Sequence, residues 1–387
     1  MTLVIGTRPE AIKLAPVAHA LSARGAPPSL ILTGQHPGLM LSDHGLGGYI
    51  ATRLSCRGED DPLAHARTVA AAIAPLLADP PNLLVAQGDT SSALGGALAA
   101  VEAGVPVAHV EAGLRSFDQS MPWPEEGNRI AIDAVASLLF APTETSAANL
   151  RNEGLSGAVH VTGNSGIDAL FAALAALPAP ARARNRNGVP LILVTCHRRE
   201  NWGLGLTTVA LALIEIARST HAKIDCVLHP NPLVRDSMRS LLDGEPGIRL
   251  VEPYDHGAMI AAMRDADLIL SDSGGVQEEA PALGVPLLVL REKTERPEGV
   301  ASGNMQLVGT NTERIVDAVS RLLADAGALA AMGRPALPFG DGHAGPRIAT
   351  HMLDWIAATA LIRTAVPDLT SPPSIDIGPA WLQGPFV

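Results

Sequence analysis

Short apolar runs alternate along the chain with longer segments in which Ala and Leu recur at helical spacing. The apolar runs occupy residues 3–5, 30–32, 83–86, 105–110, 138–141, 191–194, 224–228, 268–270 and 287–290. Apolar strands of this length, separated by helices, are typical of parallel sheets that are covered by helices on both faces. The pattern therefore predicts an α/β protein.

The length of the chain, 387 residues, is too great for one ordinary core, so we expect two domains. Residues 177–190, LPAPARARNRNGVP, lack apolar periodicity and indicate a linker between an N-terminal domain at 1–176 and a C-terminal domain at 191–345. A helix at 346–360 is expected to return to the N-terminal domain. The Pro-rich tail at 361–387 is expected to be loosely ordered or to form a wrapped extension.

Two segments repeat the same order of features. One is LLVAQGDTSSALGGALAAVEAGVPVAHV at 83–110, and the other is LILSDSGGVQEEAPALGVPLLVL at 268–290. Each contains a strand, an Asp among small residues, a helix, Gly-Val-Pro and a second strand. This repetition supports two Rossmann-like domains of related design, with a ligand crevice between them, where pockets are common.

The composition narrows the possible functions. The net charge of −11 provides no general basic field for nucleic acid, so a polyanionic substrate must meet a local cationic site. The three cysteines, Cys56, Cys196 and Cys226, form no CxxC pair, as expected in a reducing cytosol. No signal-like segment precedes the first apolar run, and no apolar run reaches about 18 residues. We therefore expect a cytoplasmic protein without membrane insertion.

Acidic residues follow two of the predicted strands, at the edge of the sheet where open α/β folds bind ligands. The segment 107–129, VAHVEAGLRSFDQSMPWPEEGNR, places Glu111 directly after a strand, and its Pro-rich part can bring Glu125 back toward the same crevice. Asp89 follows the strand at 83–86. Asp89 is either the N-cap of the next helix or a carboxylate that points into the crevice.

Cations follow the first strand, in Gly-Thr-Arg-Pro-Glu-Ala-Ile-Lys. Pro9 suits the first turn of a helix, so Arg8 and Lys13 lie near a helix N-terminus. A helix N-terminus with two cations is a natural phosphate site. The alternative is that both side chains are ordinary surface cations on a solvated helix.

A second phosphate signal is the segment SDSGGVQEE at 271–279. Gly274 and Gly275 allow the backbone to approach a ligand closely, and Ser273 and the following N–H groups can hold a diphosphate. Glu279, one turn further along, can accept both ribose hydroxyls of a nucleotide. A plain turn at the start of a helix is the alternative explanation.

Two histidines also follow predicted strands. His229 precedes Pro-Asn-Pro, and its place at a strand end beside prolines favours a role in the crevice over a structural one. His197 and His229 lack the pairing with a Cys or a third His that a metal centre requires, so no metal site is expected.

Eight motifs occur in a fixed order: GTRPEAIKLAP, GDT, HVEAGLR with PWPEEGNR, TGN with IDAL, HRREN, HPNP, SDSGGVQEEAPALGVP and TERPEGV. Together they resemble the non-hydrolysing UDP-N-acetylglucosamine 2-epimerase family, over residues 4–356. The resemblance implies the two-domain GT-B fold with the ligand in the interdomain cleft. It also implies a homodimer that needs no cofactor and serves cell-surface polysaccharide biosynthesis.

The implied reaction inverts C2 of UDP-GlcNAc to give UDP-ManNAc. UDP is eliminated across C1–C2 to leave 2-acetamidoglucal and is then added back. By resemblance, Asp89, Glu111 and Glu125 are the acid/base carboxylates, and His229 is the histidine implicated in catalysis near the diphosphate. Closely placed acids can have split pKa values, one acting as acid and one as base. The resemblance does not assign which carboxylate removes the C2 proton.

The resemblance also assigns substrate-binding residues. Those expected near the diphosphate are Arg8, Lys13, Ser273, Gly274 and Gly275, with Arg296 as a further UDP contact. Glu279 is expected at the ribose, and Tyr254 and Met259 are expected to frame the uracil. Gln35 and Arg198 match positions of a second, activating substrate site, although the Gln35 segment lacks one expected polar side chain.

Other activities compete with this interpretation. The intact Pro-Trp-Pro-Glu-Glu segment argues against a hydrolysing relative that releases free ManNAc. An NAD-dependent sugar epimerase is disfavoured because no Tyr-xxx-Lys occurs. The residue four positions after Tyr49, for example, is Arg53 rather than lysine. A GT-B glycosyltransferase would not need the acids, and a silent nucleotide-sugar sensor would not retain them. The same chemistry on a modified sugar, such as UDP-2,3-diacetamido-glucuronate, stays open.

Overall fold

The computed structural model describes residues 1–178, 188–196, 198 and 201–365. Its N-terminal strands are β1 (Thr2–Ile5), β2 (Ser29–Leu32), β3 (Ala51–Arg53), β4 (Leu84–Gln87), β5 (Val107–Val110), β6 (Leu138–Ala141) and β7 (Ala158–Val161). The helices between them are α1 (Arg8–Ser22), α2 (Pro62–Ile73), α3 (Ser91–Glu102), α4 (Glu125–Val135) and α5 (Glu144–Asn152), with short 3-10 turns η1 (Leu41–His44) and η2 (Ala74–Leu77). Helix α6 (Ser165–Ala176) follows β7.

The second half repeats the alternation. Its strands are β8 (Leu191–Thr195), β9 (Lys223–Val227), β10 (Ile248–Val251), β11 (Leu268–Ser271), β12 (Leu287–Val289) and β13 (Met305–Leu307). Its helices are α7 (Leu204–Thr220), α8 (Pro232–Leu242), α9 (His256–Asp265), α10 (Gly274–Leu283), α11 (Pro297–Ala301), α12 (Thr312–Ala324), α13 (Ala326–Met332) and α14 (Ala344–Ala365).

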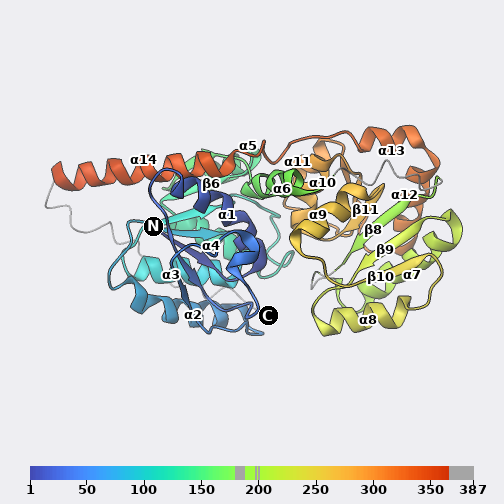
Figure 1. Ribbon diagram of the computed structural model, residues 1–387, viewed down its shortest axis with the longest axis horizontal. Coiled ribbons are helices and arrows are strands. Elements are labelled where there is room, and N and C mark those ends of the chain that lie inside the picture. Colours follow the sequence, from blue (N-terminus) through green and yellow to red (C-terminus); the bar gives the residue numbers. More distant parts are fainter. Residues whose placement is uncertain (179–187, 197, 199–200, 366–387) are drawn as a thin grey trace.

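The strands form two parallel sheets that lie side by side (Figure 1). Their strand orders are β3-β2-β1-β4-β5-β6-β7 and β10-β9-β8-β11-β12-β13. In each sheet the first three strands are added in one direction, and the fourth returns to the other side of the first, as in doubly wound folds. The prediction of two Rossmann-like domains with parallel sheets is therefore confirmed.

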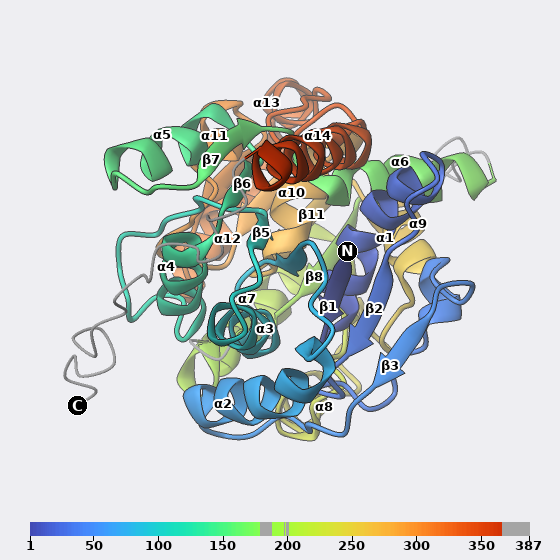
Figure 2. The ribbon, with the colours of Figure 1, turned by 90° about the vertical axis from the view of Figure 1, so that its left-hand side faces the viewer.

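Each sheet is covered by helices on both faces. In the N-terminal domain, α2 and α3 pack on one face and α1 on the other (Figure 2). In the C-terminal domain, α7, α8 and α12 cover one face, and α9 and α10 cover the opposite one. This double coverage explains why the central strands consist of continuous apolar residues.

Two helices connect the domains. The side chains of Ile167 and Leu170 on α6 belong to the core of the C-terminal domain. Helix α14 runs back along the N-terminal domain, where Ile348 and Met352 pack in the core beside α1 (Figure 1). The helix continues to Ala365, beyond the predicted end at residue 360. Most of the predicted linker and tail, at 179–187 and 366–387, lies outside the described residues.

The strands without a clear apolar run in the sequence are those at the sheet edges. Strands β3, β7, β10 and β13 each occupy one end of a sheet. Most of their side chains are exposed or half-buried. An edge strand needs less apolar surface because fewer elements cover it, and hydrophobic periodicity is correspondingly weak there.

Candidate active site

Side chains from the loops and helices that follow the carboxyl ends of the strands in the two sheets meet in ion pairs across the domain boundary. The pairs are Lys13 with Glu278, Glu111 with Arg296, and Glu125 with Arg198. In open α/β sheets this end is the one that binds ligands. The interdomain contact is therefore the candidate active site.

Four charged side chains at this contact, Lys13, Glu111, Glu278 and Arg296, form what we call the interdomain cluster. Lys13 Nζ lies 2.5 Å from Glu111 Oε1 and 2.9 Å from Glu278 Oε2. Arg296 Nη2 lies 2.6 Å from Glu278 Oε1 and 3.4 Å from Glu111 Oε1. Each cation thus contacts both carboxylates. Glu111, Glu278 and Arg296 are buried, so water screens these charges weakly.

Burial and charge act in opposite directions on the two carboxylates. Burial raises the pKa of both, but in Glu111 the charges of Lys13 and Arg296 outweigh it, and the pKa is lowered. In Glu278 burial prevails over the same two cations, and the charge of Glu111 adds to it, so the pKa is raised. The pKa values of the two carboxylates are thus displaced in opposite directions, and Glu278 is the member of the pair that gains a proton more readily.

The loop after β5 holds Glu111 in a strained conformation. Its φ is 72°, in the left-handed region that non-glycine residues rarely adopt. Asn164 Nδ2 donates to Glu111 Oε1 at 3.0 Å, and Gln87 Nε2 donates to Oε2. Strain of this kind persists only where surrounding contacts impose it, and it is concentrated at functional sites.

Asp89 lies in the turn after β4, where Arg129 of α4 holds its carboxylate. Arg129 Nη2 donates to Asp89 Oδ2, and Asn128 Nδ2 donates to the Asp89 carbonyl at 2.8 Å. Thr90, not Asp89, is the N-cap of α3, since its hydroxyl accepts from Ala93 N. Arg129 Nη1 also donates to Glu126 at 2.7 Å, and Glu126 accepts from the backbone of the loop after β5, which gives it an anchoring role.

Glu125 is the third candidate acid and meets the other domain. Its Oε1 accepts from Arg198 Nη1 at 2.9 Å. Its Oε2 is buried and has no hydrogen-bond partner among the described residues. Burial raises the pKa of Glu125; Arg198 opposes this shift, and the charge of Asp89 adds to it. An acid in this setting is suited to carry a proton.

The turn before α10 presents its backbone toward the same region. Ser273 is the N-cap residue, and around Gly275 a Cβ atom would meet only Ser273 Oγ, at 3.9 Å. A Cβ on Gly274 would lie 2.9 Å from Arg296 Nη1, so the guanidinium of Arg296 rests on this turn. Glu279 points elsewhere: its Oε1 lies 3.6 Å from His256 Nε2.

The remaining predicted residues lie around this centre rather than in it. Arg8 Nη2 donates to the Tyr254 carbonyl at 3.0 Å, which places it beside the predicted uracil segment, where Met259 packs on the C-terminal core. Gln35 accepts from Ser92 Oγ at 2.7 Å. His229 Nδ1 accepts from Asn231 N at 3.1 Å, at the start of α8.

Two further observations concern the described residues only. No three of their His, Cys, Asp or Glu side chains group as metal ligands, and none of their helices combines the length and apolar character needed to cross a membrane. His197 lies outside the described residues.

Comparisons with known proteins identify the family. The family model described as UDP-N-acetylglucosamine 2-epimerase matches residues 19–353. The chain belongs to this epimerase family. A UDP-N-acetylglucosamine 2-epimerase of Yersinia pestis is 41% identical over 372 residues, which cover 89% of this chain and 96% of the relative.

Solved structures of epimerases agree with the described fold. The UDP-GlcNAc 2-epimerase of Neisseria meningitidis, bound to UDP-GlcNAc, superimposes with a TM-score of 0.86 at 36% identity and covers 91% of this chain and 99% of its own. The enzyme of Methanocaldococcus jannaschii, in complex with UDP-GlcNAc and UDP, gives a TM-score of 0.80 at 34% identity, with 92% and 99% covered.

The structure of this epimerase-family chain adds residues that the sequence motifs did not single out. Glu278 completes the interdomain cluster, Arg129 holds Asp89, and Gln87 and Asn164 hold Glu111. Glu278 lies one position before Glu279 in a motif of two adjacent acids. The two adjacent acids were the only sign in the sequence that Glu278 could have a role of its own. Adjacent positions of a helix point about 100° apart, so their side chains contact different neighbours.

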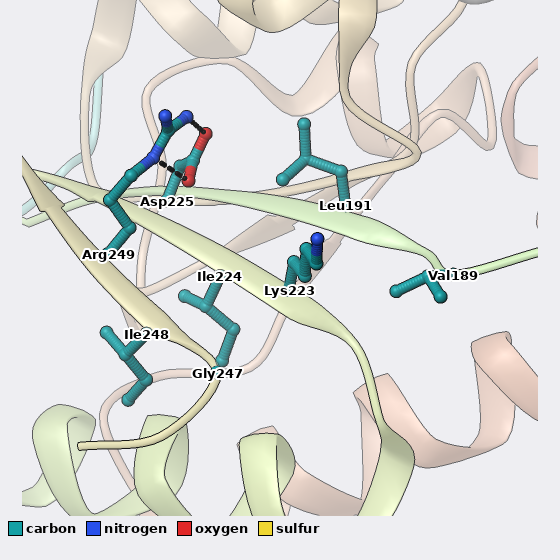
Figure 3. Close-up of a pocket in the computed structure, with 8 residues that line it drawn as sticks. All are labelled: Val189, Leu191, Lys223, Ile224, Asp225, Gly247, Ile248 and Arg249. Carbon is teal, nitrogen blue, oxygen red and sulfur yellow. Dashed lines mark hydrogen bonds and ion pairs between the residues drawn. The ribbon is translucent and has the colours of Figure 1, made fainter. Parts of the chain in front are cut away.

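A cavity of about 520 Å³ lies away from this centre. It is lined by residues at the beginning of β8, β9 and β10, with the Asp225–Arg249 ion pair along one side (Figure 3). These are the amino ends of the strands, opposite to the end that binds ligands in such sheets. The interdomain cluster, rather than this cavity, is therefore the candidate active site of this epimerase-family member.

Replacing Gly113 with alanine is expected to destabilise the protein by at least about 2 kcal/mol and to lower turnover. Gly113 has a φ of 82°, and a Cβ there would lie 2.3 Å from Ser146 O. Since Gly113 lies in the same turn as Glu111, two residues further along, a shift of its backbone moves that carboxylate. Urea denaturation and initial rates measure the two effects.

Gly127 provides the matched control. It is exposed in α4, and a Cβ there would meet nothing within 4 Å. Gly127→Ala should stabilise the protein by about 0.5–1 kcal/mol, because Ala loses less entropy in a helix. A Gly113→Ala variant as stable as Gly127→Ala would contradict the proposed strain.

Proposed function

We propose that this protein interconverts UDP-N-acetylglucosamine and UDP-N-acetylmannosamine. In the forward direction a carboxylate removes the C2 proton, the C1–O bond breaks, and UDP leaves with that electron pair to give 2-acetamidoglucal. Addition of UDP to C1 and of a proton to the opposite face of C2 then gives the epimer. The observation that carries this proposal is Glu111, held ionised between Lys13 and Arg296 beside the Ser273–Gly275 turn.

The geometry supports different roles for the carboxylates, which transfer protons, and for the cations, which stabilise the charge of the diphosphate. Glu111, Glu125 and Asp89 are the proton-transfer candidates, and Glu125 carries the proton more readily than Glu111 because burial raises its pKa. Lys13 and Arg296 lie beside the turn where the diphosphate is expected, so they can stabilise the charge of departing UDP. Arg8 and Tyr254 would lie toward the nucleoside, with Glu279 on the ribose.

Turnover of UDP-GlcNAc in deuterated water tests the mechanism. We expect solvent deuterium at C2 of both epimers, because the proton removed from C2 exchanges before the glycal is protonated again. Proton NMR measures the loss of the C2 signal. An epimerised product without deuterium would contradict elimination, and free ManNAc would indicate hydrolysis.

A panel of UDP-sugars in the same assay separates UDP-GlcNAc from modified sugars such as UDP-2,3-diacetamido-glucuronate. By family resemblance, we also propose that the protein is a cytoplasmic homodimer whose product serves cell-surface polysaccharide synthesis. Light scattering of the purified protein measures its mass in solution. A mass near 40 kDa, that of one chain, would contradict the dimer.

A further inference from the structure

Glu278 is the member of the interdomain cluster that the elimination mechanism does not use. Its side chain is 2% exposed and contacts both Lys13 and Arg296. Arg296 Nε also donates to Glu278 Oε1 at 2.7 Å. These are the two cations that the proposed function assigns to the diphosphate. Glu278 and a bound diphosphate therefore compete for the same partners.

The position of Arg296 makes this competition direct. The three guanidinium atoms nearest to a Cβ on Gly274 would lie at 2.9–3.0 Å from it, so the group rests on the turn expected to bind the diphosphate. A diphosphate bound on this turn would contact one side of the Arg296 guanidinium. Glu278 already contacts the same guanidinium through Nε and Nη2. With Glu278 ionised, the bound diphosphate would face two carboxylates in a buried region that contains only two cations of the cluster.

Helices α6, α9 and α11 and strands β11 and β12 pack against α10. The charged groups that act directly on Glu278 are Lys13 on α1, Glu111 after β5 and Arg296 before α11. Other charged groups on or next to the packed elements include Glu295 beside Arg296, Asp272 after β11, Asp168 on α6, His256 on α9, and Glu298 on α11, which accepts from Thr143 Oγ1. Most are engaged with other groups: Asp272 accepts from Arg198 N and Asn201 Nδ2, Asp168 accepts from the backbone of residues 344–345, and His256 faces Glu279.

Among the acids of this group, Glu278 is the best placed to lose its charge. Glu295 is paired with both Arg291 and Arg296, and its pKa is lowered because these and other arginines outweigh burial. Glu111 has two amide donors besides its cations. Of the three acids that contact Arg296, only Glu278 has a pKa that burial raises above its ordinary value. Burial also raises the pKa of Asp168, but this residue accepts from the backbone of residues 344–345 rather than from the two cations.

We propose that Glu278 is a positioning residue that holds Lys13 and Arg296 in the empty site and takes up one proton when the nucleotide sugar binds. Protonated Glu278 releases both cations to the diphosphate and keeps a hydrogen bond to Glu111. The inference rests on the proposed function in that the ligand is a UDP-sugar. Binding of UDP-GlcNAc is then linked to proton uptake, and affinity falls as the pH rises.

Titration calorimetry tests this linkage in buffers of different ionisation enthalpy. The probe is UDP-GlcNAc brought to epimeric equilibrium beforehand, so that turnover adds no net heat; its diphosphate has no group that titrates near neutral pH. For the wild type we expect uptake of up to one proton per site and a Kd that rises by up to about tenfold per pH unit above about pH 7.

Glu278→Gln, a neutral isostere, should bind with little proton uptake and with a Kd that is nearly independent of pH. Glu279→Gln, the adjacent acid on the same helix, is the matched control: it should weaken binding at every pH and retain the wild-type uptake. A purely structural Glu278 would alter affinity or stability without changing the proton count. Uptake in Glu278→Gln equal to that of the wild type would overturn the proposal.

The wild-type measurement stands alone if Glu278→Gln fails to fold, because a wild type that binds without proton uptake also overturns the proposal. That result leaves the epimerase function intact. Absence of any UDP-GlcNAc binding by the folded wild type would overturn both the proposed function and this inference.

Discussion

Replacing Glu111 with glutamine is expected to lower kcat for UDP-GlcNAc epimerisation by about 10²- to 10⁴-fold, the usual contribution of a positioned general acid or base. Glutamine has nearly the same shape but cannot accept the C2 proton. The charges of Lys13 and Arg296 also lower the pKa of Glu111, which favours the ionised form that a base needs. Initial rates by proton NMR measure the loss, and exchange of the C2 proton with solvent should fall with it.

Glu102→Gln serves as the control for this substitution, because Glu102 is exposed at the end of α3. Its kcat should equal that of the wild type. The Glu111→Gln variant should still bind UDP, since the cations and the Ser273–Gly275 turn remain. If it kept more than about a tenth of the wild-type kcat, Glu111 could not be the principal proton-transfer group.

The buried central strands could be predicted from the sequence, whereas the exposed edge strands could not. The central strands of both sheets have continuous apolar residues because helices cover them on both faces. The edge strands lack this signal because little packs on their outer side. The helical segment α14 is visible in the sequence, but its end at Ala365 is not, since Pro-rich sequence begins only at Pro367.

The candidate site could be predicted in its residue types but not in its pairings. The positions of Glu111, Arg8 and Lys13 after strands and at a helix start indicated an anionic ligand and acid/base chemistry, whereas Arg296 was expected only from the family resemblance. That Lys13 and Arg296 are shared between Glu111 and Glu278 depends on how the two domains pack, and no local pattern encodes that packing. For the same reason the rotation of α10, which turns Glu278 to the cluster and Glu279 to His256, was not predictable.

Arg198 illustrates the same limit. Resemblance placed it in a possible second substrate site, and its position after β8 was consistent with any crevice role. In the structure its guanidinium pairs with Glu125, one of the candidate acids. Any second site that includes Arg198 must therefore share it with Glu125, and occupancy of that site would change the charge around a proton-transfer group.

The turns that carry Asp89 and Glu111 are joined by a buried group of charges centred on Asp133 of α4. Asp133 Oδ1 lies 2.6 Å from His109 Nδ1, and Oδ2 lies 2.8 Å from Arg115 Nη1 and accepts from Gly113 N at 3.1 Å. His109 Nε2 lies 2.7 Å from the carbonyl of Gly88, directly before Asp89. Asp133 thus fixes the turns of Asp89 and Glu111 relative to each other.

Asp133→Asn is expected to destabilise the protein by about 3–5 kcal/mol, because it removes one partner of a buried ionic group and leaves Arg115 partly uncompensated. Asp133 is fully buried, whereas the side chain of Asp236 is 69% exposed in its pair with Arg235. Asp236→Asn is therefore the matched control, with an expected loss within about 1 kcal/mol. Chemical denaturation measures both values, and an equal loss in the two variants would contradict the role given to Asp133.

The pH dependence of the stability lost in Asp133→Asn follows from the direction in which the pKa of Asp133 is shifted. Burial raises the pKa of Asp133, but the charges of His109 and Arg115 outweigh it, so the pKa in the folded state is lowered. A carboxylate whose folded pKa is depressed stabilises the protein fully above its unfolded pKa of about 4, and this contribution is lost as the pH falls through the folded value. The part of the difference between wild type and Asp133→Asn that comes from the Asp133 charge should therefore be fully present above about pH 5 and shrink below about pH 4. A difference that stayed unchanged below about pH 4 would contradict a depressed pKa of Asp133, and the link between the turns of Asp89 and Glu111 would then not depend on its charge.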